Sequence, residues 1–143
     1  MTLYRTVLLT VVLLVAACTP DTPASVSDAW VRLPAPGSVN SAAYMTINNH
    51  ASTDLALTEV RSPKFGRIEI HRTQMVAGVM QMRMTSELTI PPGGQLELRP
   101  GGLHLMLMEP VSPVAEGERI PMTLFSEGDP VLELNLTVSR QAP

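Results

Sequence analysis

The sequence is poor in cysteine, lysine and aromatic residues, and each shortage excludes a class of function. Cys18 is the single cysteine among 143 residues, which excludes an internal disulfide and a zinc or iron–sulfur site built on several cysteines. Lys64 is the single lysine, and the formal net charge is −3. Nucleic-acid binding needs a basic surface and aromatic side chains for base stacking, yet aromatic residues make up only 3% of the chain. We therefore expect no nucleic-acid partner.

Residues 1–17 resemble a bacterial lipoprotein signal peptide. They carry one charge, Arg5, followed by an apolar run shorter than the roughly 20 residues of a membrane-spanning helix. The run ends in Val-Ala-Ala-Cys, which is similar to a lipobox and implies cleavage before Cys18 and lipidation of that residue. Residues 18–25 then form a flexible tether rich in Pro and Thr. We expect the mature protein in the periplasm or cell envelope, held at the membrane by its lipid anchor; an ordinary secretion signal is the alternative.

Residues 26–140 are the predicted folded domain, which we expect to be all-β and monomeric. The chain has the length of one domain, and thirteen prolines argue against long helices. Short alternating runs separated by Pro and Gly favour an antiparallel sandwich or barrel. The predicted strands are 28–33, 42–48, 55–60, 67–72, 79–85, 95–99, 103–109, 119–125 and 131–138.

Methionine is the residue type in excess, with nine in the chain. In the strands predicted at 67–72 and 103–109, Ile and Leu alternate with other side chains, so that His71, His104 and Met106 point away from an aliphatic core. Imidazole nitrogen and thioether sulfur together suit soft Cu(I), whereas Ca²⁺ and Mg²⁺ prefer oxygen and Zn²⁺ rarely binds thioethers. Histidine must be neutral to bind a metal, so binding should weaken as the pH falls through about 6.5.

The spacing of these residues resembles the signature of a known family. Ten residues separate His71 from Met82, a further 21 separate Met82 from His104, and one separates His104 from Met106. The pattern His-x10-Met-x21-His-x-Met is the signature of the PCuAC family of periplasmic copper chaperones. The resemblance implies that these four residues bind Cu(I) at an exposed site.

The resemblance covers about residues 26–138 and implies a fold and a role. The implied fold is a cupredoxin-like Greek-key β-sandwich. The implied role is copper delivery toward the Cu-A centre of cytochrome c oxidase, with subunit II of the oxidase and a Sco-type chaperone as partners. Arg72 stands where family members often carry a further Met, but the four ligands remain. Blue-copper electron transfer needs a Cys thiolate, which Cys18 at the anchor does not supply, and we expect no enzymatic activity.

The other methionines and the remaining histidine have simpler interpretations. Methionine is an adaptable core residue, and we expect Met80 and Met84 to pack rather than to bind metal. Met75 and Met108 lie close to the ligands in sequence and are candidates for auxiliary donors. We expect Met45, Met122 and Trp30 in the core, and we expect His50 to be only solvated.

Several functions remain open at the level of the sequence. A copper-sequestering or resistance lipoprotein of the envelope would use the same four ligands as a delivery protein. A copper oxygenase would need an open coordination position, whereas two His and two Met already saturate Cu(I). A structural lipoprotein whose methionines only pack would bind no copper, and copper would then leave its melting temperature unchanged.

Overall fold

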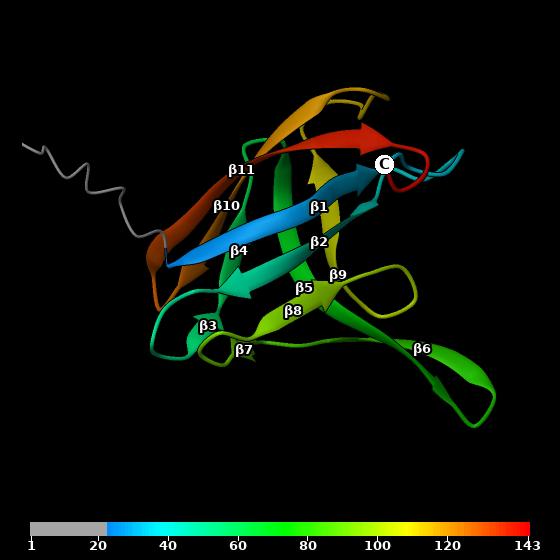
Figure 1. The fold of residues 1–143 in the computed structure, drawn as a ribbon. Coiled ribbons are helices and arrows are strands. Elements are labelled where there is room, and N and C mark those ends of the chain that lie inside the picture. The colour runs from blue at the N-terminus through cyan, green and yellow to red at the C-terminus, as the bar shows by residue number, and fades with distance from the viewer. Residues whose placement is uncertain (1–22) are drawn as a thin grey trace, which may run out of the picture.

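The computed structural model describes residues 23–143, which form strands and no helix (Figure 1). The predicted all-β class is confirmed. The predicted signal peptide at 1–17, the predicted lipidation site Cys18 and residues 18–22 of the predicted tether lie outside the described residues. In the described part of the chain we find no helix long and apolar enough to cross a membrane. The strands are β1 (Ala24–Arg32), β2 (Ser41–Asn49), β3 (Leu55–Leu57), β4 (Glu59–Arg61), β5 (Phe65–Val76), β6 (Val79–Met84), β7 (Leu88–Ile90), β8 (Gln95–Leu98), β9 (Leu103–Pro110), β10 (Arg119–Ser126) and β11 (Asp129–Ser139).

Several strands differ from the sequence prediction in their bounds, and one strand was not predicted. β1 begins at Ala24, inside the predicted tether, because Ala24 and Ser25 pair with the end of β2. The strand predicted at 55–60 is divided into β3 and β4, since β3 pairs with β7 whereas β4 pairs with β10. Between the two, the backbone amide of Thr58 donates a hydrogen bond to the Phe125 carbonyl. The sequence does not predict β7, whose three residues are too few for a clear alternation.

Nine strands form one large sheet, and β3 and β7 form a small second sheet. The order along the large sheet is β4-β10-β11-β1-β2-β9-β5-β6, with β8 paired to β2 off this path. The predicted antiparallel pairing holds with one exception, because β1 runs parallel to β11, with Trp30 opposite Thr137. β1 already pairs antiparallel with β2 along its other edge, so it joins the C-terminal strand to the rest of the sheet.

β2 changes its partner along its length, and this change sets the position of β9. The first half of β2 pairs with β9, with Ala42 opposite Met106. The second half pairs with β8, with Met45 opposite Leu98. The Pro100–Gly102 loop connects β8 to β9, and Gly101 adopts a φ of 76°, a left-handed conformation that glycine reaches without strain. This loop therefore lies beside the start of β9, where His104 follows.

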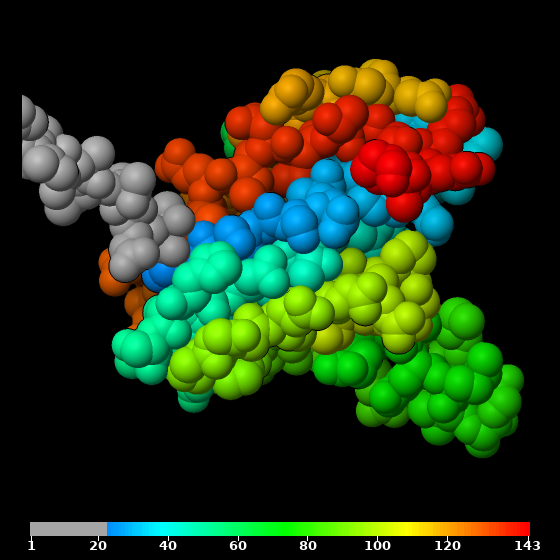
Figure 2. Space-filling view, viewed as in Figure 1, coloured from blue at the N-terminus to red at the C-terminus, as the bar shows by residue number. Residues whose placement is uncertain are grey.

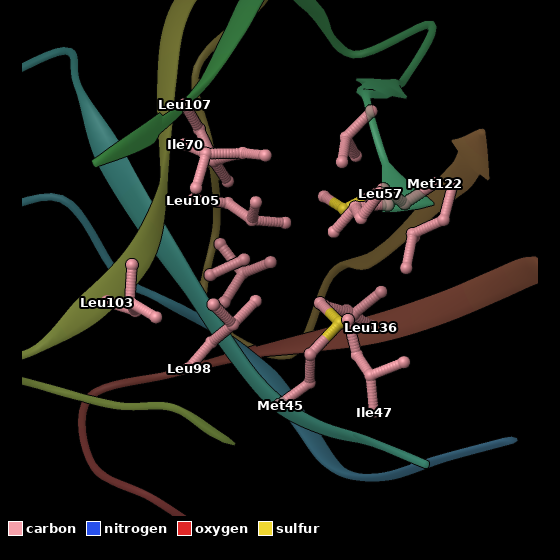
Figure 3. Packing of buried hydrophobic residues seen from close by; sticks show 14 of the residues in the cluster. Met45, Ile47, Leu57, Ile70, Leu98, Leu103, Leu105, Leu107, Met122 and Leu136 are labelled. Carbon is pink, nitrogen blue, oxygen red and sulfur yellow. The ribbon is translucent and has the colours of Figure 1, made fainter. Parts of the chain in front are cut away.

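A cluster of aliphatic and methionine side chains, together with Phe65, fills the core (Figure 3). In Figure 3, Leu105 and Leu107 of β9 lie on one side of the cluster, and Met122 of β10 and Leu136 of β11 lie on the other. All four are at most 2% exposed. Replacing a leucine buried to this degree by alanine costs about 2–5 kcal/mol of stability. The core thus fixes β9 firmly, with every second side chain of that strand directed away from the cluster.

The far end of the β5–β6 hairpin projects from the body of the protein (Figures 1 and 2). β9 accompanies β5 only as far as the pair Arg72–Leu103. Beyond that point the Thr73 amide still donates a hydrogen bond to the Gly102 carbonyl, and the rest of β5 pairs with β6. The hairpin turns at Ala77 and Gly78, whose φ angles are 50° and 79°. We call residues 73–84 the methionine arm. The predicted strand at 67–72 ends four residues too early, because it does not include this part of β5.

Candidate metal centre

Two neighbouring strands place three of the four predicted ligands on one face of the sheet. His71 of β5 lies directly opposite His104 of β9, and Met106 lies opposite Glu69 two positions further along. Cross-strand neighbours share a face, and the alternate residues Ile70, Leu103 and Leu105 are buried in the core on the other face. The prediction that the histidines and Met106 point away from the core is therefore confirmed.

The two imidazole rings are close enough to share one ion. Their centroids are 5.9 Å apart, and the ring planes meet at 70°. Because an imidazole nitrogen ligates a first-row metal ion at about 2.0 Å, the centroids of two rings that share an ion lie roughly 5–6.5 Å apart. The observed separation fits this range without any movement of the strands.

Met82 reaches the same region from the methionine arm. It lies on β6 opposite Thr73 and is 52% exposed. An open surface cleft is lined by Met82, His104 and Met106 together with Tyr44 and other residues. His71 does not line this cleft itself but borders it through its contact with the His104 ring. The structure thus brings the four predicted residues to one region, with Met82 at its exposed side.

The hydrogen bond of His104 determines which of its nitrogens is free. Nδ1 of His104 lies 3.1 Å from the carbonyl oxygen of Gly102. A carbonyl can only accept a hydrogen bond, so Nδ1 carries the proton and Nε2 keeps a lone pair. Burial lowers the pKa of His104 below its usual value, and positive charge on His71 lowers it further, against the opposing effect of the Gly102 hydrogen bond. These effects favour the neutral imidazole that a metal ion requires.

His71 keeps the other nitrogen free. Its Nε2 lies 2.8 Å from Oε2 of Glu69, and the carboxylate accepts a hydrogen bond that Nε2 donates. Its Nδ1 is buried and has no hydrogen-bond partner, the single such side-chain nitrogen or oxygen found within residues 23–143. Buried polar atoms are nearly always satisfied, and an exception calls for an explanation such as an absent ion. A metal ion bound at Nδ1 would satisfy this atom.

Glu69 is a candidate positioning residue for His71 that the sequence did not point to. It holds His71 by hydrogen bond and is itself 3.5 Å from the guanidinium of Arg67. A carboxylate that fixes the orientation of a ligating histidine is common around protein metal sites. Its position two residues before His71 on the same strand could have identified it, because that spacing puts both side chains on one face.

A row of aromatic rings supports the site from the side of β1. The Trp30 and Tyr44 ring centroids are 4.9 Å apart, and those of Tyr44 and His104 are 6.4 Å apart. Trp30 and Tyr44 are 4% and 6% exposed. Trp30 is therefore buried, as predicted, but it lies on the face of the metal centre and not in the aliphatic cluster. The row restricts the movement of the His104 ring and places the single tryptophan near the site.

The methionines outside the predicted set divide into core and exposed groups. Met45 and Met122 are 1% and 2% exposed, which confirms their predicted place in the core. The prediction that Met80 and Met84 pack is wrong, because they are 66% and 64% exposed. Met80 lies on the arm beyond the end of β9, whereas Met84 lies opposite His71, where the arm begins. Met80 also lines the cleft that holds Met82.

The two candidates for auxiliary donors also differ from each other. Met108 is 8% exposed, and its sulfur contacts the guanidinium of Arg67 at 3.5 Å. A cation in that position disfavours a metal ion, so Met108 is a poor donor. Met75 is 65% exposed at the far part of the arm.

The third histidine does not belong to this region. His50 is exposed, as predicted, and its Nε2 lies 2.7 Å from Oγ of Ser25.

The arrangement suits a soft ion and little else. Two neutral imidazole nitrogens and two thioether sulfurs match the preference of Cu(I). Within residues 23–143 no group of three or more His, Cys, Asp or Glu side chains is placed to hold a metal ion.

Comparison with known proteins relates the chain to a lipoprotein family. A family model described as "Putative lipoprotein LpqE-like" matches residues 24–138. A curated relative from Leifsonia xyli subsp. xyli, named "Putative lipoprotein Lxx21020", is 36% identical over 105 residues, which are 72% of this chain. The match covers 62% of that relative, so this chain spans less than two thirds of the relative's length.

Solved structures share the fold. The copper-bound PCuAC domain from PmoF2 superposes with a TM-score of 0.68 at 23% identity, covering 83% of this chain and 94% of that domain. The solution structure of CuI-DR1885 from Deinococcus radiodurans has a TM-score of 0.65 at 30% identity, covering 87% of this chain and 82% of the other. The predicted cupredoxin-like fold class is confirmed by these matches.

Proposed function

We propose a copper-carrying role for this chain, which belongs to the LpqE-like lipoprotein family and has the fold of PCuAC domains. In this proposal His71, Met82, His104 and Met106 bind one Cu(I) ion as cargo. The bound copper in the PmoF2 domain and the Cu(I) in DR1885 support the choice of metal. The family description as a lipoprotein supports export and an anchor at the membrane.

One observation carries the proposal. The buried Nδ1 of His71 lacks a partner, and the facing His104 has its own Nδ1 occupied by the Gly102 carbonyl. Each ring therefore offers one nitrogen lone pair to a metal ion, and the ring centroids lie 5.9 Å apart. A structural role for the two histidines would leave no reason for the unpaired buried nitrogen.

The site combines rigid and movable ligands, as a carrier needs. The histidines lie on strands fixed by the core, and His104 is only 5% exposed. Met82 is half exposed on the projecting arm. A partner can therefore approach the ion from the Met82 side and replace one sulfur at a time, while the imidazoles keep the ion in place. This asymmetry favours exchange over permanent burial.

A Cu(I) competition titration with a chromogenic chelator tests the binding site. We expect the double variant His71→Ala, His104→Ala to lose more than about 100-fold in affinity, beyond the range for substitutions in the surrounding shell. Met106→Leu should weaken binding and leave the fold intact, because leucine keeps the volume. His50→Ala is the matched control and should bind as the parent does. A double variant that binds Cu(I) as tightly as the parent would refute the proposal.

A transfer assay tests delivery, the further part of the proposed role. We propose that the ion passes to the Cu-A centre on subunit II of cytochrome c oxidase, in company with a Sco-type chaperone. The Cu(I)-loaded protein mixed with an apo Cu-A domain should hand over its copper, with the Cu-A absorption bands appearing after oxidation. If the copper stays on the carrier at equilibrium, storage or copper resistance is its function instead.

A further inference from the structure

The methionine arm carries more sulfur than the proposed centre uses. Met75, Met80, Met82 and Met84 are 65%, 66%, 52% and 64% exposed. Large apolar side chains gathered in one exposed patch mark a functional surface more often than a structural one. Met82 belongs to the proposed centre and Met84 lies opposite His71 beside it. Met75 and Met80, further along the arm, need another explanation.

The register gathers the sulfurs on one face of the arm. Met75 lies directly opposite Met80, and Met82 lies opposite Thr73, so Met82 is the diagonal neighbour of Met75. The other face carries different chemistry, because its cross-strand pairs are Arg72–Arg83, Gln74–Gln81 and Val76–Val79. The two faces of this narrow ribbon therefore differ sharply, with thioethers on one and arginine, glutamine and valine on the other.

The opposed pair Met75–Met80 has the geometry and the chemistry for a soft metal ion. The Cβ atoms of directly opposed residues lie about 4.5–5.5 Å apart, and the flexible methionine side chains allow both sulfurs to reach one ion between them. The sequence from residue 73 to residue 84 contains no Asp or Glu and one cation, Arg83. A hard cation finds no carboxylate there, whereas thioethers bind Cu(I) and Ag(I) without losing a proton.

The pair is continuous with the proposed centre. Met80 and Met82 both line the open cleft that His104 and Met106 line. The sulfurs of Met75, Met80 and Met82 thus lead from the far end of the arm to the two histidines. Figure 2 shows that the arm stands clear of the body, where a donor or acceptor protein can reach it.

We propose that Met75 and Met80 form a second, weaker Cu(I) site, which loads and unloads the main centre through Met82. The role as a loading site rests on the proposed function, but the binding of a second soft ion does not. With two thioether ligands and no imidazole, the second site should hold its ion less tightly than the main centre. Weak binding at an exposed site permits rapid exchange with a partner.

Titration of protein carrying ¹³C-methyl methionine with Cu(I) under reductant, and in parallel with Ag(I), tests this proposal. The first equivalent should shift the Met82 and Met106 methyl signals, and only the second should shift those of Met75 and Met80. Native mass spectrometry should record two ions on the parent and one on the Met75→Leu, Met80→Leu variant. The control Val76→Leu, Val79→Leu changes the opposite face of the same arm and should keep two ions.

Variants of the main centre separate the two proposals. His71→Ala with His104→Ala should abolish the first, tight ion and keep the shifts of Met75 and Met80. That result supports the second site whether or not the main centre functions as proposed. The second site is refuted if the parent takes up one ion only and excess metal leaves the Met75 and Met80 signals unmoved. The same outcome leaves the proposed copper-carrying role intact.

Discussion

At the scale of single residues, the two histidines of the centre present different nitrogens. His71 presents Nδ1, because Glu69 occupies Nε2, and His104 presents Nε2, because the Gly102 carbonyl occupies Nδ1. Each neighbour fixes both the tautomer and the orientation of its ring. The proposed ligand set therefore depends on two groups that are not ligands themselves, the Glu69 carboxylate and the Gly102 carbonyl, and the first of these can be replaced by mutation.

Replacing Glu69 should weaken Cu(I) binding while the fold survives. Glu69→Ala leaves His71 free to rotate and to change tautomer, and the loss of such a partner typically lowers metal affinity by about 10–100-fold. Glu69→Gln keeps an acceptor for Nε2 and should restore part of the loss. Chelator competition measures both values, with the exposed Glu133→Ala as control. Unchanged affinity in Glu69→Ala would show that His71 does not need this carboxylate.

Glu118 should make stability depend on pH in the acid range. The hydrogen bond from Lys64, 2.5 Å away, lowers the pKa of Glu118 below its usual value, and the backbone amide of Ala115 adds to this effect. The unfolded chain therefore takes up a proton on Glu118 before the folded chain does. Its contribution to stability is complete above the unfolded pKa of about 4.5 and is lost as the pH falls through the lower folded pKa.

Urea unfolding between pH 6 and pH 3 measures this dependence. The parent should lose stability on acidification more steeply than Glu118→Gln, which has no proton to take up at that position. The difference between the two curves should shrink toward the acid end of the range. Parallel curves at all pH values would contradict the assigned role of the Lys64–Glu118 pair.

Side-chain direction was predictable at this scale, but hydrogen-bond partners and exposure were not. The period of two along a strand places His71, His104 and Met106 away from the core, and this prediction is confirmed. The alternation along a strand does not predict where the neighbouring strand ends, and that end decides whether a side chain is covered. Met80 was expected to pack, and it is exposed because β9 begins at Leu103 and does not accompany the arm.

At the scale of elements, the arm is a two-stranded hairpin without support from a third strand. Such hairpins are marginally stable by themselves, so the arm should open more readily than the core strands. Its turn consists of Ala77 and Gly78, both with positive φ. Two positive φ angles are typical of a type I′ turn, in which Asn-Gly is the preferred pair and alanine is strained at the first position.

Replacing Ala77 by Asn should therefore stabilise the arm. Asn tolerates the left-handed conformation, and we expect a gain of roughly 0.5–1 kcal/mol in the opening free energy of the hairpin. Hydrogen exchange of the β6 amides should slow by about two- to fivefold, with the melting temperature of the core nearly unchanged. Gly78→Ala is the opposite control and should accelerate exchange. Slower exchange in both variants, or in neither, would contradict this account of the turn.

The elements themselves were predictable where they are long and alternate, as in β9 and β10. They were not predictable where pairing decides the boundary. Leu55–Leu57 and Glu59–Arg61 form one alternating run in the sequence, but they pair with different strands in different sheets. The distant partner, and not the local pattern, divides the run at Thr58, which is bonded to Phe125.

At the scale of the whole molecule, the core and the metal centre occupy opposite faces of the same strands. β9 contributes Leu105 and Leu107 to the core and His104 and Met106 to the centre. Stability and metal binding can therefore be altered separately, because a substitution on one face leaves the other in place.

Copper should stabilise the whole domain if the proposed centre is formed before the ion binds. A ligand at 100 times its dissociation constant adds about 2.7 kcal/mol to the stability of the folded state. In a domain of this size the melting temperature should then rise by on the order of 10 °C. Met122→Leu, a core substitution, should keep the rise, and His71→Ala should lose most of it. A melting temperature that Cu(I) leaves unchanged would favour a structural lipoprotein.

The central claim is that two imidazoles and two thioethers surround one Cu(I) ion, and X-ray absorption at the copper K-edge tests it most directly. For the protein loaded with one equivalent, we predict two nitrogen scatterers at about 2.0 Å and two sulfur scatterers at about 2.3 Å. Met82→Leu combined with Met106→Leu should remove the sulfur shell. A spectrum of the parent that contains only nitrogen and oxygen neighbours, unchanged by those two substitutions, would contradict the claim.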